Sequence, residues 1–209
     1  DYWLKDKEYC VLSRAGKGED MMLAMVSERR LMPLMQAMLD QAEFLAEVGI
    51  RSLSKYHEEN GYYLNIEGEQ FGIHYEPGES TTRMFGGNSN WRGPVWFPMN
   101  YMLLESLRTM YDYYVEMIQL PFPTQGGSKM NLQQITEEIA KRLISIFLPD
   151  EEGHRPVNDR DPRYAEDPHF KDLILFYEYF HGENLSGLGA SHQTGWTGLV
   201  ANLILEVSD

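Results

Sequence analysis

Five stretches of the sequence carry apolar residues at the three- and four-residue spacing of amphipathic helices. We expect these helices over residues 31–46, 98–114, 131–147, 170–177 and 194–207. Each apolar stripe must be buried against another element. Helix bundles usually have short connections, whereas the segments between these stretches are long and contain many glycines and prolines. The sequence therefore predicts an all-α fold in which antiparallel helix pairs form a toroid with long Gly-rich loops.

The intervening segments are expected to be largely irregular. Residues 86–94 hold three glycines in nine positions and cannot form regular structure. Residues 120–130 and 149–168 are rich in proline or glycine and predict loops. Tyr62, Leu64 and Ile66 alternate with polar or aromatic neighbours, which is consistent with either a short strand or an extended loop.

The charge of the chain narrows the choice of partners. The 209 residues hold 18 Lys and Arg against 32 Asp and Glu, which gives a formal net charge of −14. That charge disfavours nucleic acid and anionic membrane surfaces as partners, and no apolar stretch is long enough to predict a membrane segment. The single cysteine, Cys10, excludes an intrachain disulfide and favours a reducing compartment such as the cytoplasm.

Aromatic residues are concentrated between Met84 and Tyr114, where 8 of the 31 residues are Phe, Trp or Tyr. Trp91 and Trp96 lie there beside Asn90 and Arg92. Flat aromatic faces stack on sugar rings, while amide and guanidinium groups bind hydroxyls. This combination predicts a sugar pocket. The alternative is that Trp96 and Phe97 simply fill the core where a helix begins.

Glu178 is the candidate catalytic residue because Tyr177 and Tyr179 flank it near the end of an expected apolar helix. A carboxylate in such a place is partly removed from water, as a general base requires. The alternative is a glutamate on the solvent-facing side of a short helix. Glu183 follows in a loop and is interpreted as a solvated charge.

No cofactor is predicted. The six histidines show no ligand spacing such as His-x-x-x-His, so a metal site is not expected, although Ca²⁺ in a loop stays open. The sequence contains no phosphate-binding loop and no dinucleotide fingerprint.

Two segments carry a resemblance to a known family. The first is Gly86-Gly87-Asn88-Ser89-Asn90-Trp91-Arg92-Gly93-Pro94-Val95-Trp96. The second runs from Glu178 through Gly189-Ala190-Ser191-His192-Gln193-Thr194-Gly195-Trp196-Thr197. Together they resemble the signatures of glycoside hydrolase family 63, which includes the processing α-glucosidases. The likeness extends over most of residues 20–209, which correspond to the C-terminal part of the family's catalytic domain.

The resemblance implies a partial (α/α)6 barrel and an inverting α-glycosidase that acts on α-glucoside-type oligosaccharides. All of residues 1–209 would then be the C-terminal portion of that catalytic domain. By the matched positions, Glu178 would be the general base. The residues lining the sugar pocket would be Asn90, Trp91, Arg92, Trp96, His192, Gln193 and Trp196.

The sequence also departs from the family's pattern. A complete barrel has six helix pairs, and only about half of these helices can be drawn here. The family's general acid is an aspartate in a block expected upstream of Asp1. We therefore expect the remainder of the domain as a partner, an oligosaccharide as substrate, and no activity from this chain alone. A non-catalytic carbohydrate-binding domain is the alternative, and a purely structural helical scaffold ranks third.

Overall fold

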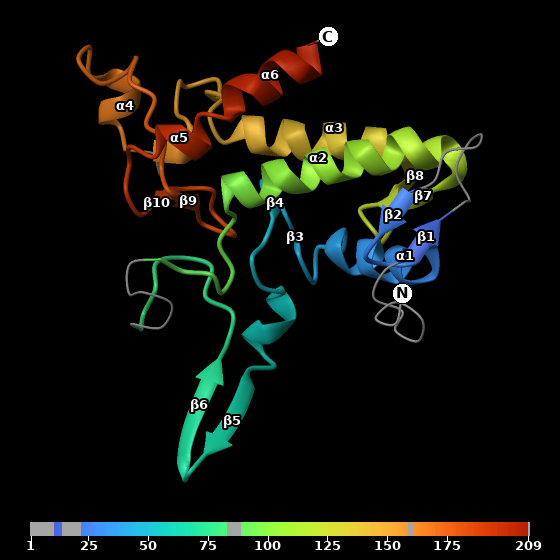
Figure 1. Ribbon diagram of the computed structural model, residues 1–209. Helices are drawn as coiled ribbons and strands as arrows, with labels where there is room; N and C mark the ends of the chain where they lie inside the picture. Colours follow the sequence, from blue (N-terminus) through green and yellow to red (C-terminus); the bar gives the residue numbers. More distant parts are fainter. Residues whose placement is uncertain (1–10, 14–21, 83–88, 159–160, 209) are drawn as a thin grey trace.

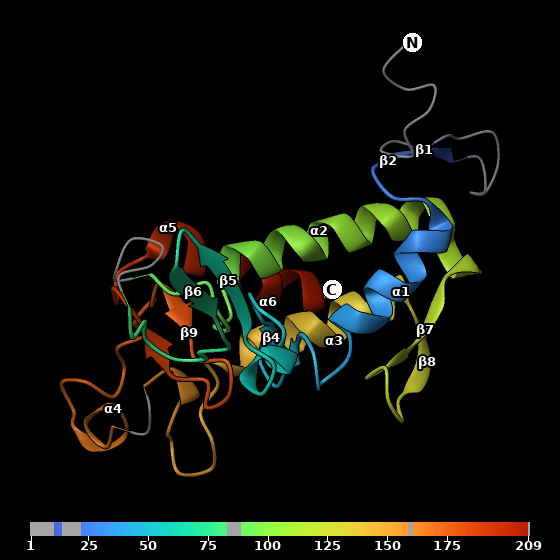
Figure 2. The ribbon, with the colours of Figure 1, turned by 90° about the horizontal axis from the view of Figure 1, so that it is seen from below.

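Two long antiparallel helices form the centre of the structure (Figure 1). They are α2 (Phe97–Tyr114) and α3 (Leu132–Ser145), and α6 (Val200–Ser208) packs along α3. The computed structural model describes residues 11–13, 22–82, 89–158 and 161–208. Figures 1 and 2 both place α1 (Glu28–Met38) near one end of α2, and α4 (Arg163–Glu166) and α5 (Thr194–Thr197) at the other.

Helix α3 forms as predicted because its start and its apolar face are both encoded locally. The Asn131 side chain accepts a hydrogen bond from the Gln134 backbone N–H (2.9 Å), and the Gln134 side chain accepts one from the Asn131 N–H (3.0 Å). This capping box satisfies two of the free amides of the first turn. The expected stripe is buried throughout, namely Leu132, Ile135, Ile139, Leu143, Ile146 and Phe147.

Helix α2 also begins and ends where expected, but only part of its expected apolar stripe is buried. The stripe is Met99, Met102, Leu103, Leu107, Met110 and Tyr114; Leu107 and Tyr114 are buried, Leu103 and Met110 are partly buried against the core, and Met99 and Met102 are exposed. The polar Asn100 is buried near the start of the helix instead, with 2% of its surface exposed. Apolar residues occur on more than one side of this helix, so periodicity alone did not identify every residue that meets the core.

The prediction of an all-α fold and a partial (α/α)6 barrel is wrong. The structure is 39% helix and 19% strand. In its described part, ten short strands form five two-stranded antiparallel sheets. The pairs are β1 (Val11–Ser13) with β2 (Met22–Ala24), β3 (Leu45–Ala46) with β4 (Gly49–Ile50), β5 (Tyr62–Ile66) with β6 (Glu69–Ile73), β7 (Gln119–Phe122) with β8 (Ser128–Asn131), and β9 (Tyr179–Phe180) with β10 (Gly187–Leu188).

The loops expected between helices close into hairpins instead. Glu67 and Gly68 both have positive φ (51° and 89°), which is the geometry of the tight turn that joins two antiparallel strands. This turn makes the alternating segment at 62–66 a strand, and the β5–β6 hairpin projects away from α2 (Figure 1). The Pro/Gly segment at 120–130 likewise contributes to the β7–β8 hairpin.

The helix expected over 31–46 ends at Met38. The Asp40 side chain accepts a hydrogen bond from the Ala42 N–H (2.8 Å), and this local bond competes with a continuing helix. Leu45 and Ala46 then enter β3, where both are buried. A short, fully buried strand is apolar at every position and so continues a helical stripe by coincidence.

Two further helix predictions fail near the C-terminus. Residues 170–177 form turns and extended chain, with Leu173 and Ile174 exposed. A helix of two turns without a buried face has little to stabilise it. The helix expected over 194–207 is broken at Gly198 into α5 and α6. Single 3₁₀ turns occupy Lys55–Glu58, Val115–Met117 and Pro156–Asn158.

No helix within the described residues combines the length and the apolar character that a membrane crossing requires.

Asn100 joins α2 to the β3–β4 hairpin. Its Oδ1 accepts a hydrogen bond from the Ile50 N–H (2.7 Å), and its Nδ2 donates to the Ile50 carbonyl (3.0 Å) and the Trp96 carbonyl (3.0 Å). These three bonds satisfy the buried amide and fix the hairpin against the first turns of the helix.

Asn100→Ala is expected to lower the free energy of unfolding by about 2–3 kcal/mol, because it leaves the buried backbone groups of Ile50 unpaired. Urea denaturation of the purified protein measures this change. Ser106→Ala, on the exposed side of the same helix, should stay within about 0.5 kcal/mol of wild type. Equal stability of the two variants would contradict the anchoring role of Asn100.

Candidate functional site

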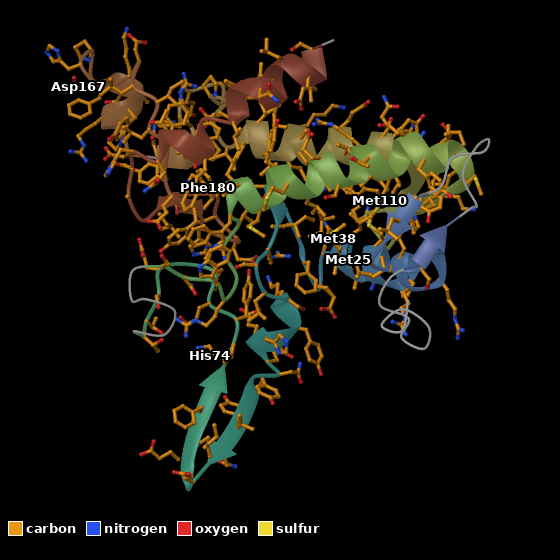
Figure 3. The ribbon with its side chains drawn as sticks, viewed as in Figure 1. Met25, Met38, His74, Met110, Asp167 and Phe180 are labelled. Carbon is orange, nitrogen blue, oxygen red and sulfur yellow. The ribbon has the colours of Figure 1, made fainter. Side chains whose placement is uncertain are left out.

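The two glycine-bearing segments meet at a backbone bridge. The Val95 N–H donates to the Phe180 carbonyl (2.9 Å), and the Phe180 N–H donates to the Val95 carbonyl (2.9 Å). Figure 3 shows Phe180 beside the start of α2, where its ring contacts that of Phe97. The bridge brings residues 89–96 next to Glu178, although more than 80 residues separate the two segments along the chain.

Aromatic side chains next to this bridge form a stack. Trp91 and Trp96 are parallel, with ring centroids 4.0 Å apart, and Tyr179 stacks on Trp96 at 4.7 Å. Trp196 meets Trp96 edge-on at 5.8 Å. Trp96 and Tyr179 are buried, whereas 39% of Trp91 is exposed. Trp91 therefore presents an aromatic surface to solvent on a rigid base.

Trp91 and Trp96 also line a pocket of about 220 Å³. Its described lining is Ile50, Arg51, Ser52, Trp91, Trp96, Met99, Asn100 and Leu103. This volume is below the range of about 300–1,000 Å³ that holds drug-sized ligands, so the pocket can accept only part of an oligosaccharide. Glu178 is not among the lining residues.

Glu178 lies directly before β9, not near the end of a helix as expected. Its Oε1 accepts a hydrogen bond from the Ser89 hydroxyl (3.4 Å), and its Oε2 accepts one from the Ala190 N–H (3.3 Å). Both bonds are long. Only 9% of the residue is exposed, and no Lys, Arg or His among the described residues forms an ion pair with it.

Two nearby glutamates, Glu76 and Glu183, do form ion pairs. Glu76 is buried and pairs with Arg92 at 2.7 Å. Glu183 pairs with Arg51 (3.1 Å) and Lys55 (2.9 Å), so it is part of an ion-pair network and not the solvated charge expected.

The pKa of Glu183 reflects that network. Burial raises the pKa of its carboxyl, but hydrogen bonds from Lys55 and Tyr75, together with the charge of Arg51, outweigh burial and hold the pKa below its ordinary value.

Asn90 and Arg92 are engaged with other protein groups. The fully buried Asn90 donates to the Glu76 and Gly78 carbonyls (2.7 and 2.8 Å) and accepts bonds from the Arg92 N–H and Nε (3.0 and 3.2 Å). Arg92 also donates to the Ser80 hydroxyl (2.9 Å). In this structure both side chains shape the loop that carries Trp91.

The remaining predicted site residues lie on the second segment. His192 is exposed and forms a backbone bridge with Phe176, and the Gln193 N–H donates to the Phe176 carbonyl (2.7 Å). Trp196 reaches the aromatic stack from α5. Gly86, Gly87 and Asn88 of the first motif lie outside the described residues.

Sequence reasoning missed two residues at this site. Glu79 accepts hydrogen bonds from the Tyr179 hydroxyl (2.8 Å) and the Gly189 N–H (3.1 Å). Tyr75 is buried and donates to Glu183 (2.5 Å). The only sequence signal for Glu79 is its place in the Pro77-Gly78 turn. The part of the chain that the structure describes holds no group of three or more His, Cys, Asp or Glu placed to bind a metal ion.

Comparison with known proteins shows the family of the chain. Residues 21–197 match the profile of the mannosylglycerate hydrolase MGH1-like glycoside hydrolase domain. The chain belongs to this glycoside hydrolase family. The match includes the aromatic stack, the bridge and Glu178.

Three curated relatives extend the comparison. The chain is 44% identical over 204 residues to the uncharacterized protein YMR196W of Saccharomyces cerevisiae. It is 25% identical over 177 residues to a probable mannosyl-oligosaccharide glucosidase of Schizosaccharomyces pombe, and 27% identical over 121 residues to the mannosyl-oligosaccharide glucosidase of S. cerevisiae. These alignments cover 97%, 85% and 57% of this chain, but only 19%, 15% and 11% of the relatives.

The resemblance to the processing glucosidases of glycoside hydrolase family 63 is thereby confirmed. The chain spans about a fifth or less of the length of the curated relatives it matches. The placement of residues 1–209 at the C-terminal end of a catalytic domain stays a prediction, as do the roles of the individual site residues.

Gly189 of this MGH1-like domain lies between Glu178 and Tyr179. Its φ is +69°, and an added Cβ would lie 2.7 Å from the Glu178 Oε2 and 2.9 Å from the Tyr179 Cε1. Gly189→Ala is expected to cost about 1–3 kcal/mol of unfolding free energy, because it combines left-handed strain with these contacts. Gly195→Ala is the matched control, since its Cβ would meet nothing within 4 Å. Equal denaturation midpoints for both variants would contradict the close packing at Gly189.

The lowered pKa of Glu183 predicts a stability component that depends on pH. Because the pKa is lower in the folded state, this component is present above the ordinary glutamate pKa of about 4.3 and is lost as the pH falls through the folded value. Glu183→Gln should therefore destabilise the protein at pH 7 and have little effect near pH 3, as measured by chemical denaturation across pH. Glu151→Gln, at an exposed position, is the control. A destabilisation independent of pH would exclude this ionic origin.

Proposed function

We propose that the chain supplies the general base and part of the sugar pocket of an inverting α-glycosidase that acts on α-glucoside-type oligosaccharides. The observation that carries the proposal is the buried Glu178 carboxylate, which forms no ion pair among the described residues, whereas the nearby Glu76 and Glu183 each pair with a basic side chain. Burying an unpaired carboxylate costs free energy, and such costs are concentrated at functional sites.

The chemistry of inversion needs a group of this kind. The base takes a proton from a water molecule as that water attacks the anomeric carbon. The bond to the leaving oxygen breaks, and a general acid protonates that oxygen. The acid and base carboxyl groups of inverting enzymes lie about 6.5–9.5 Å apart. Glu178 would be the base, and the acid is expected from the block that precedes this chain in the family's pattern.

The aromatic stack would supply the sugar-binding surface. Trp91 is rigid, because Trp96 supports its face, and it is partly open to solvent. An indole face of this kind binds the C–H face of a pyranose ring. Trp96 and Trp196 would act through the stack, and Asn90 and Arg92 through the shape of the loop. His192 and Gln193 would border the site.

The named relatives support the substrate class. Two of them are named mannosyl-oligosaccharide glucosidases. Because these relatives are named glucosidases, a panel of α-glucosides is the first choice of substrate. The family name refers to hydrolysis of a smaller mannosyl compound, so mannosylglycerate is the second choice.

A non-catalytic carbohydrate-binding domain is the second candidate. It is favoured by one observation, namely that the pocket lined by Trp91 and Trp96 does not include Glu178. In that case the carboxylate would have no role in turnover.

Glu178→Gln in the full-length protein tests the choice. It preserves shape but removes the base, so kcat on α-glucosyl oligosaccharides should fall by about 10²–10⁴-fold, with KM little changed. NMR of the first product should show the β-anomer released by the wild type. Glu76→Gln and Glu183→Gln are the controls, because they lose ion pairs that stabilise the fold and should retain most of kcat in folded protein.

Retention of wild-type kcat by Glu178→Gln would refute the general-base role. Release of the α-anomer would refute inversion. Oligosaccharide binding that Trp91→Ala abolishes, with no turnover by the wild type on any glycoside of the panel, would establish the binding domain instead.

A further inference from the structure

We infer that Glu79 is a positioning residue for Glu178, acting through the Tyr179 hydroxyl and the bend at Gly189 and Ala190. The inference rests on the proposed function, because it assigns a partner to the proposed general base. Glu79 would fix the direction of the Glu178 carboxylate and place a second negative charge beside it.

A continuous set of contacts joins the two carboxylates. The Glu79 Oε2 accepts a hydrogen bond from the Tyr179 hydroxyl (2.8 Å), and its Oε1 accepts one from the Gly189 N–H (3.1 Å). The next amide along the chain, that of Ala190, donates to the Glu178 Oε2 (3.3 Å). Two adjacent backbone amides of one bend therefore bind two different glutamates.

The bend transmits position because it is closely packed. An added Cβ at Gly189 would lie 2.7 Å from the Glu178 Oε2 and 2.9 Å from the Tyr179 ring. Gly189 therefore leaves no room for the bend to move toward Glu178. Since Glu79 binds the Gly189 amide from outside, loss of Glu79 would release the bend and the Ala190 amide that orients Glu178.

Tyr179 is the second link. Its ring stacks on Trp96, and its hydroxyl reaches Glu79. Burial raises the pKa of Tyr179, the hydrogen bond to Glu79 raises it further, and the negative charges of Glu79 and Glu178 both add to the rise. The hydroxyl thus stays protonated as a donor at any working pH, and the field of both carboxylates acts on one phenol.

Both carboxylates are bound by hydrogen bonds and form no ion pair among the described residues. The nearby Arg92 is paired with Glu76. The contacts through Tyr179 and the bend are therefore the described links between Glu79 and Glu178.

The experiment measures kcat and KM separately for the full-length protein on an α-glucosyl oligosaccharide. In Glu79→Gln, kcat should fall about 10-fold with KM little changed, because the base is misplaced and the sugar-binding surface is kept. Glu79→Asp keeps a carboxylate acceptor and should recover part of that loss in kcat. Glu69→Gln, on the exposed β6 strand, is the control and should behave as wild type.

Tyr179→Phe tests the link through the phenol. It removes the hydroxyl but keeps the stack on Trp96, so its rate loss and that of Glu79→Gln should be non-additive in the double variant. Wild-type kcat in Glu79→Gln would overturn the inference, as would a loss that is the same in Glu79→Asp or one that appears in KM instead of kcat. Glu178→Gln distinguishes the two proposals, because its inactivity beside a normal Glu79→Gln refutes only the role of Glu79. Full activity of Glu178→Gln refutes both.

Discussion

The paired hydrogen bonds between Val95 and Phe180 are the constraint on which the site depends. Val95 is fully buried and also bridges to Arg51, so one residue joins three segments that lie far apart in the sequence. Trp96 follows Val95, and Tyr179 precedes Phe180. The bridge therefore sets these two rings face to face, and it places Glu178 next to Ser89 without any regular element between them.

Basic side chains near the bridge form ion pairs with Glu76 and Glu183 but not with Glu178. The chain is acidic overall, yet basic side chains lie at the two glutamates whose role is structural. Arg92 neutralises Glu76, and Arg51 with Lys55 neutralises Glu183. Glu178 is nearly as buried as Glu76 and has two long hydrogen bonds instead. Glu178 is therefore the buried carboxylate that the described basic side chains leave without an ion pair, and the proposed general-base role rests on that difference.

Local patterns were sufficient for some elements and not for others. Helix α3 was predicted fully, because its capping residues and its stripe are both local. The bounds of α2 were predicted, but its buried face only in part, since Asn100 is buried for the hydrogen bonds it makes to Ile50. The segments at 39–46 and 170–177 looked helical because a buried hairpin or an aromatic turn repeats apolar residues at similar intervals. Periodicity cannot distinguish these cases.

The same difference between local and long-range features applies to the candidate site. Motif resemblance pointed to both segments and to Glu178 as a candidate, because each motif is a local stretch of the sequence. Glu79 and the Arg51–Glu183 pair could not be found in this way. Their partners lie about 100 or more positions away, and only the tertiary structure brings them together. Asn100 shows how far this dependence extends. It fixes Ile50, Ile50 precedes Arg51, and Arg51 holds Glu183, so the first turns of α2 position a carboxylate near the start of the second motif. Buried polar bonds of this kind tolerate little movement, which makes the core helix and the loops of the site parts of one cooperative unit.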